Sequence, residues 1–143
     1  MADQGYVDIA FANNYTPPVL LEDGEQKLVV ARAVYGESKA GNPMITVMLK
    51  SAIERNSAPF NYYLLFPSGD ENDNLWEGRM QAFCGAFECE ITKKLELGEE
   101  DKNGNRLIPS WKGKEGYAVV QTDPATDEYV AKNSIVRCNP RAA

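Results

Sequence analysis

Hydrophobic and polar residues alternate along several short stretches of the chain, a pattern typical of β-strands with one buried face. The clearest stretch is 44–51, where Ile45, Val47 and Leu49 alternate with Met, Thr and Lys. In 28–31 the apolar residues are continuous, which indicates contact on both faces, as in a closed or strongly bent sheet. Together these patterns predict strands over 26–35, 44–51, 60–66 and 116–122, and a last strand region in two pieces, 128–131 and 133–138.

One segment has helical periodicity instead. Over 73–87 the apolar residues recur three or four positions apart, and acidic residues stand at its start, where they favour the positive end of a helix dipole. The spacing predicts a helix whose apolar stripe packs on the core and consists of Leu75, Trp76, Met80, Phe83, Cys84 and Phe87.

The predicted order is three strands, one helix and two strands, which is the order of the OB-fold, a five-stranded Greek-key barrel. A two-layer α+β sheet with one helix is the alternative. We therefore expect a mainly β, OB-fold-like barrel with its helix between strands three and four, forming one domain over 19–140. An extended leader, 1–18, precedes it, and 68–101 forms an acidic helical insert.

The composition argues against several kinds of catalytic and metal-binding site. The 143-residue chain contains no histidine, which removes the commonest general base and the commonest metal ligand. Its three cysteines show no CxxC spacing and are expected to be buried apolar groups. We expect no catalytic activity, no metal and no cofactor. No stretch predicts a membrane span or a signal peptide, so the expected location is the cytoplasm.

The formal net charge of −6 is unevenly distributed. The leader and the first turn, 1–25, carry −5, and 68–101 carries −7. The remaining segments, which hold most of the predicted strands, carry +6. Basic strands interleaved with aromatic residues favour a nucleic-acid partner, because cations neutralise phosphates and aromatic faces stack on bases.

The candidate contacts are aromatic or basic residues near the predicted loops and on strands two and three, the face that binds oligonucleotides in OB-folds. Strand parity favours Tyr63 as exposed and Tyr62 as core, and a polar neighbourhood favours an exposed Trp111. The full set of candidate residues for binding single-stranded DNA is Tyr35, Lys39, Lys50, Arg55, Tyr62, Tyr63, Trp111, Lys112, Lys114, Tyr117, Tyr129 and Lys132.

Four segments carry a family resemblance when their order and spacing are taken together. They are 38–44 (SKAGNPM) with the strand after it, 82–87 (AFCGAF), 111–116 (WKGKEG) and 128–135 (EYVAKNSI). Over residues 19–140 the chain resembles a bacteriophage family of OB-fold single-stranded DNA-binding proteins. The resemblance implies non-catalytic coating of single strands in phage replication or recombination, within the host cytoplasm, beside replication or recombination proteins.

Two other functions stay open. The acidic helical region could dock a protein partner in an interaction or virion module. An enzyme is the third alternative, with a divalent metal on Glu88, Glu90, Glu96, Glu99, Glu100 and Asp101, although their spacing matches no metal-binding loop. A homo-oligomer is compatible with the single-strand-binding hypothesis, because multivalency raises affinity. The chain ends in 137–143 (RCNPRAA) rather than in the acidic tail of bacterial single-strand binders, so recruitment of partners through such a tail is not expected.

Overall fold

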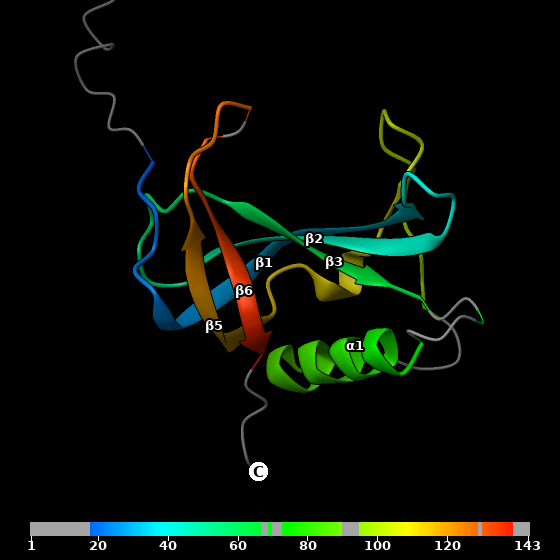
Figure 1. Ribbon diagram of the computed structural model, residues 1–143. Coiled ribbons are helices and arrows are strands. Elements are labelled where there is room, and N and C mark those ends of the chain that lie inside the picture. Colours follow the sequence, from blue (N-terminus) through cyan, green and yellow to red (C-terminus); the bar gives the residue numbers. More distant parts are fainter. Residues whose placement is uncertain (1–17, 67–68, 70–72, 90–94, 129, 139–143) are drawn as a thin grey trace, which may run out of the picture.

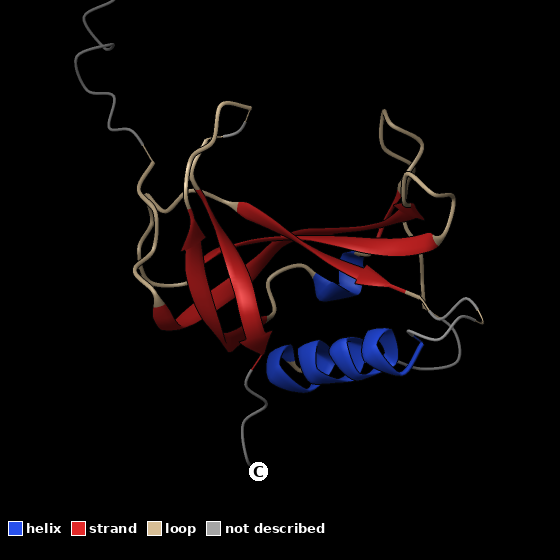
Figure 2. Cartoon of the chain, in the orientation of Figure 1, coloured by secondary structure: helices blue, strands red, loops and turns tan. Residues whose placement is uncertain are grey.

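The computed structural model describes residues 18–66, 69, 73–89, 95–128 and 130–138. Its strands form an antiparallel sheet that curls into a nearly closed barrel, with one long helix packed against it (Figure 1). The elements are β1 (Gly24–Glu37), β2 (Pro43–Ser51), β3 (Phe60–Leu65), α1 (Asp73–Phe87), β4 (Arg106–Leu107), the 3-10 helix η3 (Pro109–Trp111), β5 (Glu115–Asp123) and β6 (Lys132–Cys138). Figure 2 shows how strands dominate the described chain.

The strands follow the order β3-β2-β1-β5-β6, and β4 adds a short pairing with β1. The two edge strands, β3 and β6, lie beside each other, but no ladder joins them within the described residues. We call this gap the seam. With five main strands in Greek-key order and a helix between the third and fourth of them, the predicted OB-fold-like barrel is confirmed.

β1 organises the sheet because it pairs on both sides. Residues 28–37 of β1 pair with β2, while residues 24–29 pair with β5 and residues 34–35 with β4. The register shifts between Val30 and Arg32, so Ala31 forms a β-bulge. A bulge bends a strand and increases its twist, which lets one strand serve two parts of a curved sheet.

The core fills the barrel and extends to α1, which packs against the end of the barrel (Figure 1). Ile45, Val47 and Leu49 are fully buried, as their alternation predicts. From the helix, Met80, Phe83, Cys84 and Phe87 are buried, whereas Leu75 is 57% exposed, contrary to its predicted place in the apolar stripe. The stripe begins to face the core only about one turn into the helix.

Gly116 allows this close packing of helix on sheet. A Cβ atom at this position would collide with the carbonyl oxygen of Ala86 and lie 2.9 Å from the Phe87 ring. The backbone of β5 therefore approaches the last turn of α1 at a distance that only glycine permits.

Most element boundaries agree with the sequence prediction to within two residues, and the helix bounds agree fully. Two differences concern the insert and the last strand. The helix occupies only part of 68–101, and the described residues 95–101 are not helical. The last strand begins at Lys132, so the predicted strand over 128–131 is absent at its described residues, Glu128, Val130 and Ala131. The leader, except Pro18, lies outside the described residues.

Candidate nucleic-acid interface

The β2–β3 hairpin presents a mixed polar and aromatic surface on the side away from the core. Tyr63 pairs with Thr46, and Asn61 pairs with Met48, which in turn lies opposite Arg32 of β1. Because side chains alternate along a strand, these residues share one side of the sheet. We call this surface the outer face; it comprises Arg32, Met44, Thr46, Met48, Lys50, Asn61 and Tyr63.

Tyr63 is the exposed aromatic residue of the outer face. Its side chain is 47% exposed, whereas its neighbour Tyr62 is half-buried and packs against the core. The prediction that Tyr63 faces outward and Tyr62 inward is therefore confirmed. Lys50, two positions beyond Met48, is half-buried on the same face, and no described carboxylate forms an ion pair with it. An aromatic ring and a cation on one face are the groups that bind single-stranded nucleic acid, because bases stack on the ring and the cation attracts the phosphates.

Tyr62 belongs to an aromatic cluster between the barrel and α1. Its ring centroid is 5.9 Å from that of Phe83, and the Arg79 guanidinium lies 5.8 Å from the Tyr62 ring. Burial raises the pKa of the Tyr62 hydroxyl to about 12, and the nearby Cys138 thiol acts in the same direction. Tyr62 therefore stays neutral at any physiological pH and presents only part of its ring to solvent.

A cleft of about 410 Å³ opens at the seam. Three of the predicted contacts come together in its wall, namely Tyr62, Tyr63 and Lys132, although Lys132 follows the two tyrosines by about 70 residues in the sequence. The cleft also contains Arg79 from α1 and Asp123 from β5. Arg79 was missed because it stands in the most acidic part of the sequence; its spacing from Trp76 on the helix was the available signal.

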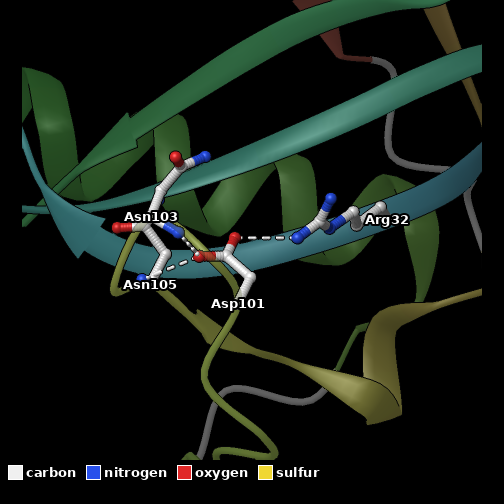
Figure 3. Close-up of polar contacts among 4 residues, drawn as sticks. All are labelled: Arg32, Asp101, Asn103 and Asn105. Atoms are coloured by element: carbon white, nitrogen blue, oxygen red, sulfur yellow. Dashed lines mark hydrogen bonds and ion pairs between the residues drawn. The ribbon is translucent and has the colours of Figure 1, made fainter.

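Arg32, on the outer face, is held by an ion pair. Its Nη2 donates to Oδ2 of Asp101 at 2.7 Å, and Oδ1 of Asp101 accepts hydrogen bonds from the backbone N–H groups of Asn103 and Asn105 (Figure 3). One carboxylate thus shapes the turn at 101–105 and ties it to β1. The sequence analysis considered Asp101 as a possible metal ligand at the end of the acidic insert and predicted no contact with Arg32.

Tyr35 and Lys39 lie at the far end of the β1–β2 hairpin. Lys39 is exposed in a loop that Ser38 closes through bonds with Asn42, and the half-buried Tyr35 ring packs edge-on against Phe66 at 5.6 Å. Tyr35 also lines a cavity of about 540 Å³ between this loop and residues 103–106. This end of the hairpin is separate from the seam cleft, and the two do not share a residue.

The predicted exposure of Trp111 is wrong. The Trp111 side chain is fully buried, and its ring centroid lies 5.6 Å from that of Phe83. η3 turns the chain so that the ring enters the core while Lys112 and Lys114 remain exposed. A ring with no exposed face cannot stack on a base, so Trp111 is a core residue.

The remaining candidates are scattered. Lys112 lines, together with Arg32, a cavity of about 430 Å³ beside the β-bulge. Tyr117 is half-buried on β5 opposite Lys27, and Arg55 is exposed in the β2–β3 turn. Tyr129 lies outside the described residues. The structure thus groups three of the twelve candidates at the seam cleft, with Lys50 on the adjoining outer face.

The three cysteines are buried and free, as the sequence predicts. Burial raises the pKa of Cys84 and Cys89 to about 12 and that of Cys138 to about 11. Within the described ranges, no three His, Cys, Asp or Glu side chains are placed to hold a metal ion. None of the helices described is both long enough and apolar enough to span a membrane.

No protein-family model matches the chain, and no curated protein matches it either. The site is therefore interpreted from its geometry and chemistry.

Proposed function

We propose that the protein binds single-stranded DNA, largely without sequence preference, across the outer face. Bases stack on Tyr63, and Lys50 and the neighbouring cations neutralise phosphates. The observation that carries the proposal is the half-exposed Tyr63 ring on β3 of an OB-fold-like barrel, on the same face as Lys50, which no described carboxylate pairs.

Overall acidity does not oppose this proposal. The net charge of −6 resides largely in 1–25 and 68–101, whereas the strand segments are basic. Binding depends on the local electrostatic potential along the outer face and the seam cleft, which the cations of β2, β6 and α1 make more positive. The sequence resemblance to a phage single-strand-binding family supports the same role, coating of DNA in the cytoplasm during replication or recombination.

The test is fluorescence anisotropy of a labelled dT oligonucleotide titrated with the full chain at several salt concentrations. We expect saturable binding that weakens linearly in log–log form as salt rises, because phosphate contacts release counterions. Tyr63→Ala should weaken binding by about 5- to 150-fold, the equivalent of 1–3 kcal/mol per stacked base. Tyr63→Phe is the matched control, since it keeps the ring and should bind nearly as the parent chain does.

A lysine variant tests the electrostatic part separately. Lys50→Gln should lower the salt slope by about one unit and leave the stacking contribution intact. An unmodified protein that binds no dT, or whose binding ignores salt, would overturn the proposal.

One observation favours a second function. Leu75 is 57% exposed on α1, within the acidic stretch 68–101. The centre of a protein–protein interface is apolar and surrounded by a polar rim, so an interaction module that uses this helix is the alternative. Leu75→Ser would then abolish a partner contact and leave DNA titrations unchanged.

A further inference from the structure

The seam cleft contains the chemistry that a nucleotide needs. Two cations, Arg79 and Lys132, line it together with the Tyr63 ring and the Asp123 carboxylate. Its volume of about 410 Å³ lies within the range of small-molecule sites. Neither cation forms an ion pair with a described side chain, although Lys132 lies opposite Asp123 in the β5–β6 ladder. The positive charges are therefore available to a ligand.

Arg79 is positioned before any ligand arrives. Its guanidinium lies 5.1 Å from the Trp76 ring centroid and 5.8 Å from that of Tyr62, so two aromatic rings hold it at the cleft wall. A guanidinium restrained in this way loses little further freedom on binding, and its planar fork matches two phosphate oxygens.

Asp123 distinguishes a nucleotide from a bare anion. Its Oδ1 accepts hydrogen bonds from Gln121 at 3.1 Å and from Ser134 at 3.2 Å, which fix the carboxylate in the cleft wall. A carboxylate repels phosphate but accepts the N–H groups that bases present. A ligand with an anion at one end and N–H donors at the other satisfies both kinds of group.

We infer that the seam cleft holds one nucleotide of a bound single strand, its phosphate on Arg79 and Lys132 and its base beside Asp123, where the strand passes over Tyr63 from the outer face. The inference rests on the proposed function and states which way the bound DNA runs: it leaves the outer face at the edge of β3 and enters the seam cleft. Arg79 thereby becomes a contact residue supplied by the acidic helix.

Trp76 reports on this site directly, because it touches Arg79 and the only other tryptophan of the chain, Trp111, is fully buried. We would titrate the full chain with a dT oligonucleotide, dTMP or inorganic phosphate and follow tryptophan emission. The oligonucleotide should change the emission at concentrations where dTMP has a slight effect and inorganic phosphate none. Trp76→Phe should abolish the signal without abolishing binding.

Charge variants then test the contacts. Arg79→Gln and Lys132→Gln should each weaken oligonucleotide binding about 5-fold or more and lower the salt slope by about one unit. Lys102→Gln is the matched control, since it removes the same charge from an exposed turn outside both surfaces. Thermal denaturation of each variant checks that the fold is retained.

The outcomes separate this inference from the proposed function. If Arg79→Gln and Lys132→Gln bind like Lys102→Gln while Tyr63→Ala is impaired, the strand does not use the cleft and the proposed function stands. If dTMP saturates the cleft tightly and the oligonucleotide leaves Trp76 unchanged, the cleft is a site for free nucleotides and the inference is overturned. If the parent chain binds no oligonucleotide, the proposed function itself fails.

Discussion

Two segments of this protein combine an aromatic residue with lysine, and the two aromatic rings differ in their exposure. On the β2–β3 hairpin, Tyr63 is 47% exposed on the same face as Lys50. In the segment around η3, Trp111 is fully buried, while Lys112 and Lys114 beside it are exposed. The compositions are alike, and the environments of the two rings are not.

The difference lies in the backbone. In a regular strand, side chains alternate between the two faces, so Tyr63 points outward because its neighbour Leu64 points into the core. A 3-10 turn after Pro109 imposes no such period, so the ring goes where burial is most favourable. Burying about 200 Å² of indole surface stabilises the fold by roughly 5 kcal/mol. The turn makes this burial possible because it places the Trp111 ring against Phe83. Aromatic–basic composition alone therefore does not identify a binding surface.

The sharpest test of this contrast is truncation of both rings. Trp111→Ala should lower the free energy of unfolding by about 3–5 kcal/mol, because it removes a fully buried ring and leaves a cavity. Tyr63→Ala should lower it by less than about 1 kcal/mol. Urea denaturation followed by circular dichroism measures both, and similar losses in the two variants would contradict the assignment of one ring to the core and the other to the surface.

Titratable groups extend the comparison of buried and exposed positions. Burial raises the pKa of the Cys84 and Cys89 thiols to about 12 and that of Cys138 to about 11, from 9.0. Between these values the unfolded chain loses protons that the folded chain keeps. The contribution of these thiols to the free energy of unfolding should therefore be constant below about pH 9, and the free energy of unfolding should fall above it by about 1.4 kcal/mol per pH unit for each thiol.

Urea midpoints at pH 8, 9 and 10 test this expectation. Cys89→Ala removes one of the thiols, so its midpoint should fall less steeply above pH 9 than that of the parent chain. Equal slopes in the two proteins would show that the thiol is not shielded from solvent.

A smaller effect concerns how the segment before η3 is fixed. Asp101→Ala removes the ion pair to Arg32 and both turn hydrogen bonds, and should cost about 1–2 kcal/mol. Asp101→Asn keeps an oxygen for the turn amides and loses the charge, so it should cost less than about 1 kcal/mol. The cost of Asp101→Asn, measured by thermal denaturation, isolates the ion pair, and the further cost of Asp101→Ala isolates the turn hydrogen bonds. Equal costs would assign the whole effect to the ion pair.

The smallest effect is a gain. Glu88 has a φ of 54° at the end of α1, and the N–H of Cys89 donates to the carbonyl oxygen of Cys84 at 3.0 Å, as in a Schellman motif. Glycine adopts this left-handed conformation without strain, so Glu88→Gly should raise the free energy of unfolding by up to about 1 kcal/mol. Glu77→Gly, inside the same helix, is the control and should lower it by a comparable amount.

Periodic segments were predictable from the sequence because one physical rule fixes all their residues at once. Strand alternation located β2 and the exposure of Tyr63, and helical spacing located α1. β4, which pairs with β1, and η3 were not predicted, since their form depends on single contacts between distant residues. The Asp101–Arg32 pair spans 69 positions, and no local pattern indicates it.

The seam cleft lies between these two cases. Tyr62, Tyr63 and Lys132 were candidates because of their residue types and predicted loops, but their meeting depends on barrel closure. Arg79 was missed because the segment 68–101 is acidic overall, whereas the rings nearest to Arg79 in space are those of Trp76 and Tyr62. The net charge of a sequence segment is therefore a poor guide to the charge of a surface that a helix shares with a strand edge.

The double pairing of β1 also sets the order in which the barrel can be completed. During synthesis, β2 and β3 follow β1 within 30 residues, but the strand that covers the other edge of Gly24–Val29 begins only at Glu115. A growing chain therefore carries an open strand edge for some 80 residues of translation, a template for wrong partners. Lys27 lies on that edge, and once β5 is in place its Nζ lies 3.3 Å from a carboxylate oxygen of Glu115, so the arriving strand brings an ion pair of its own.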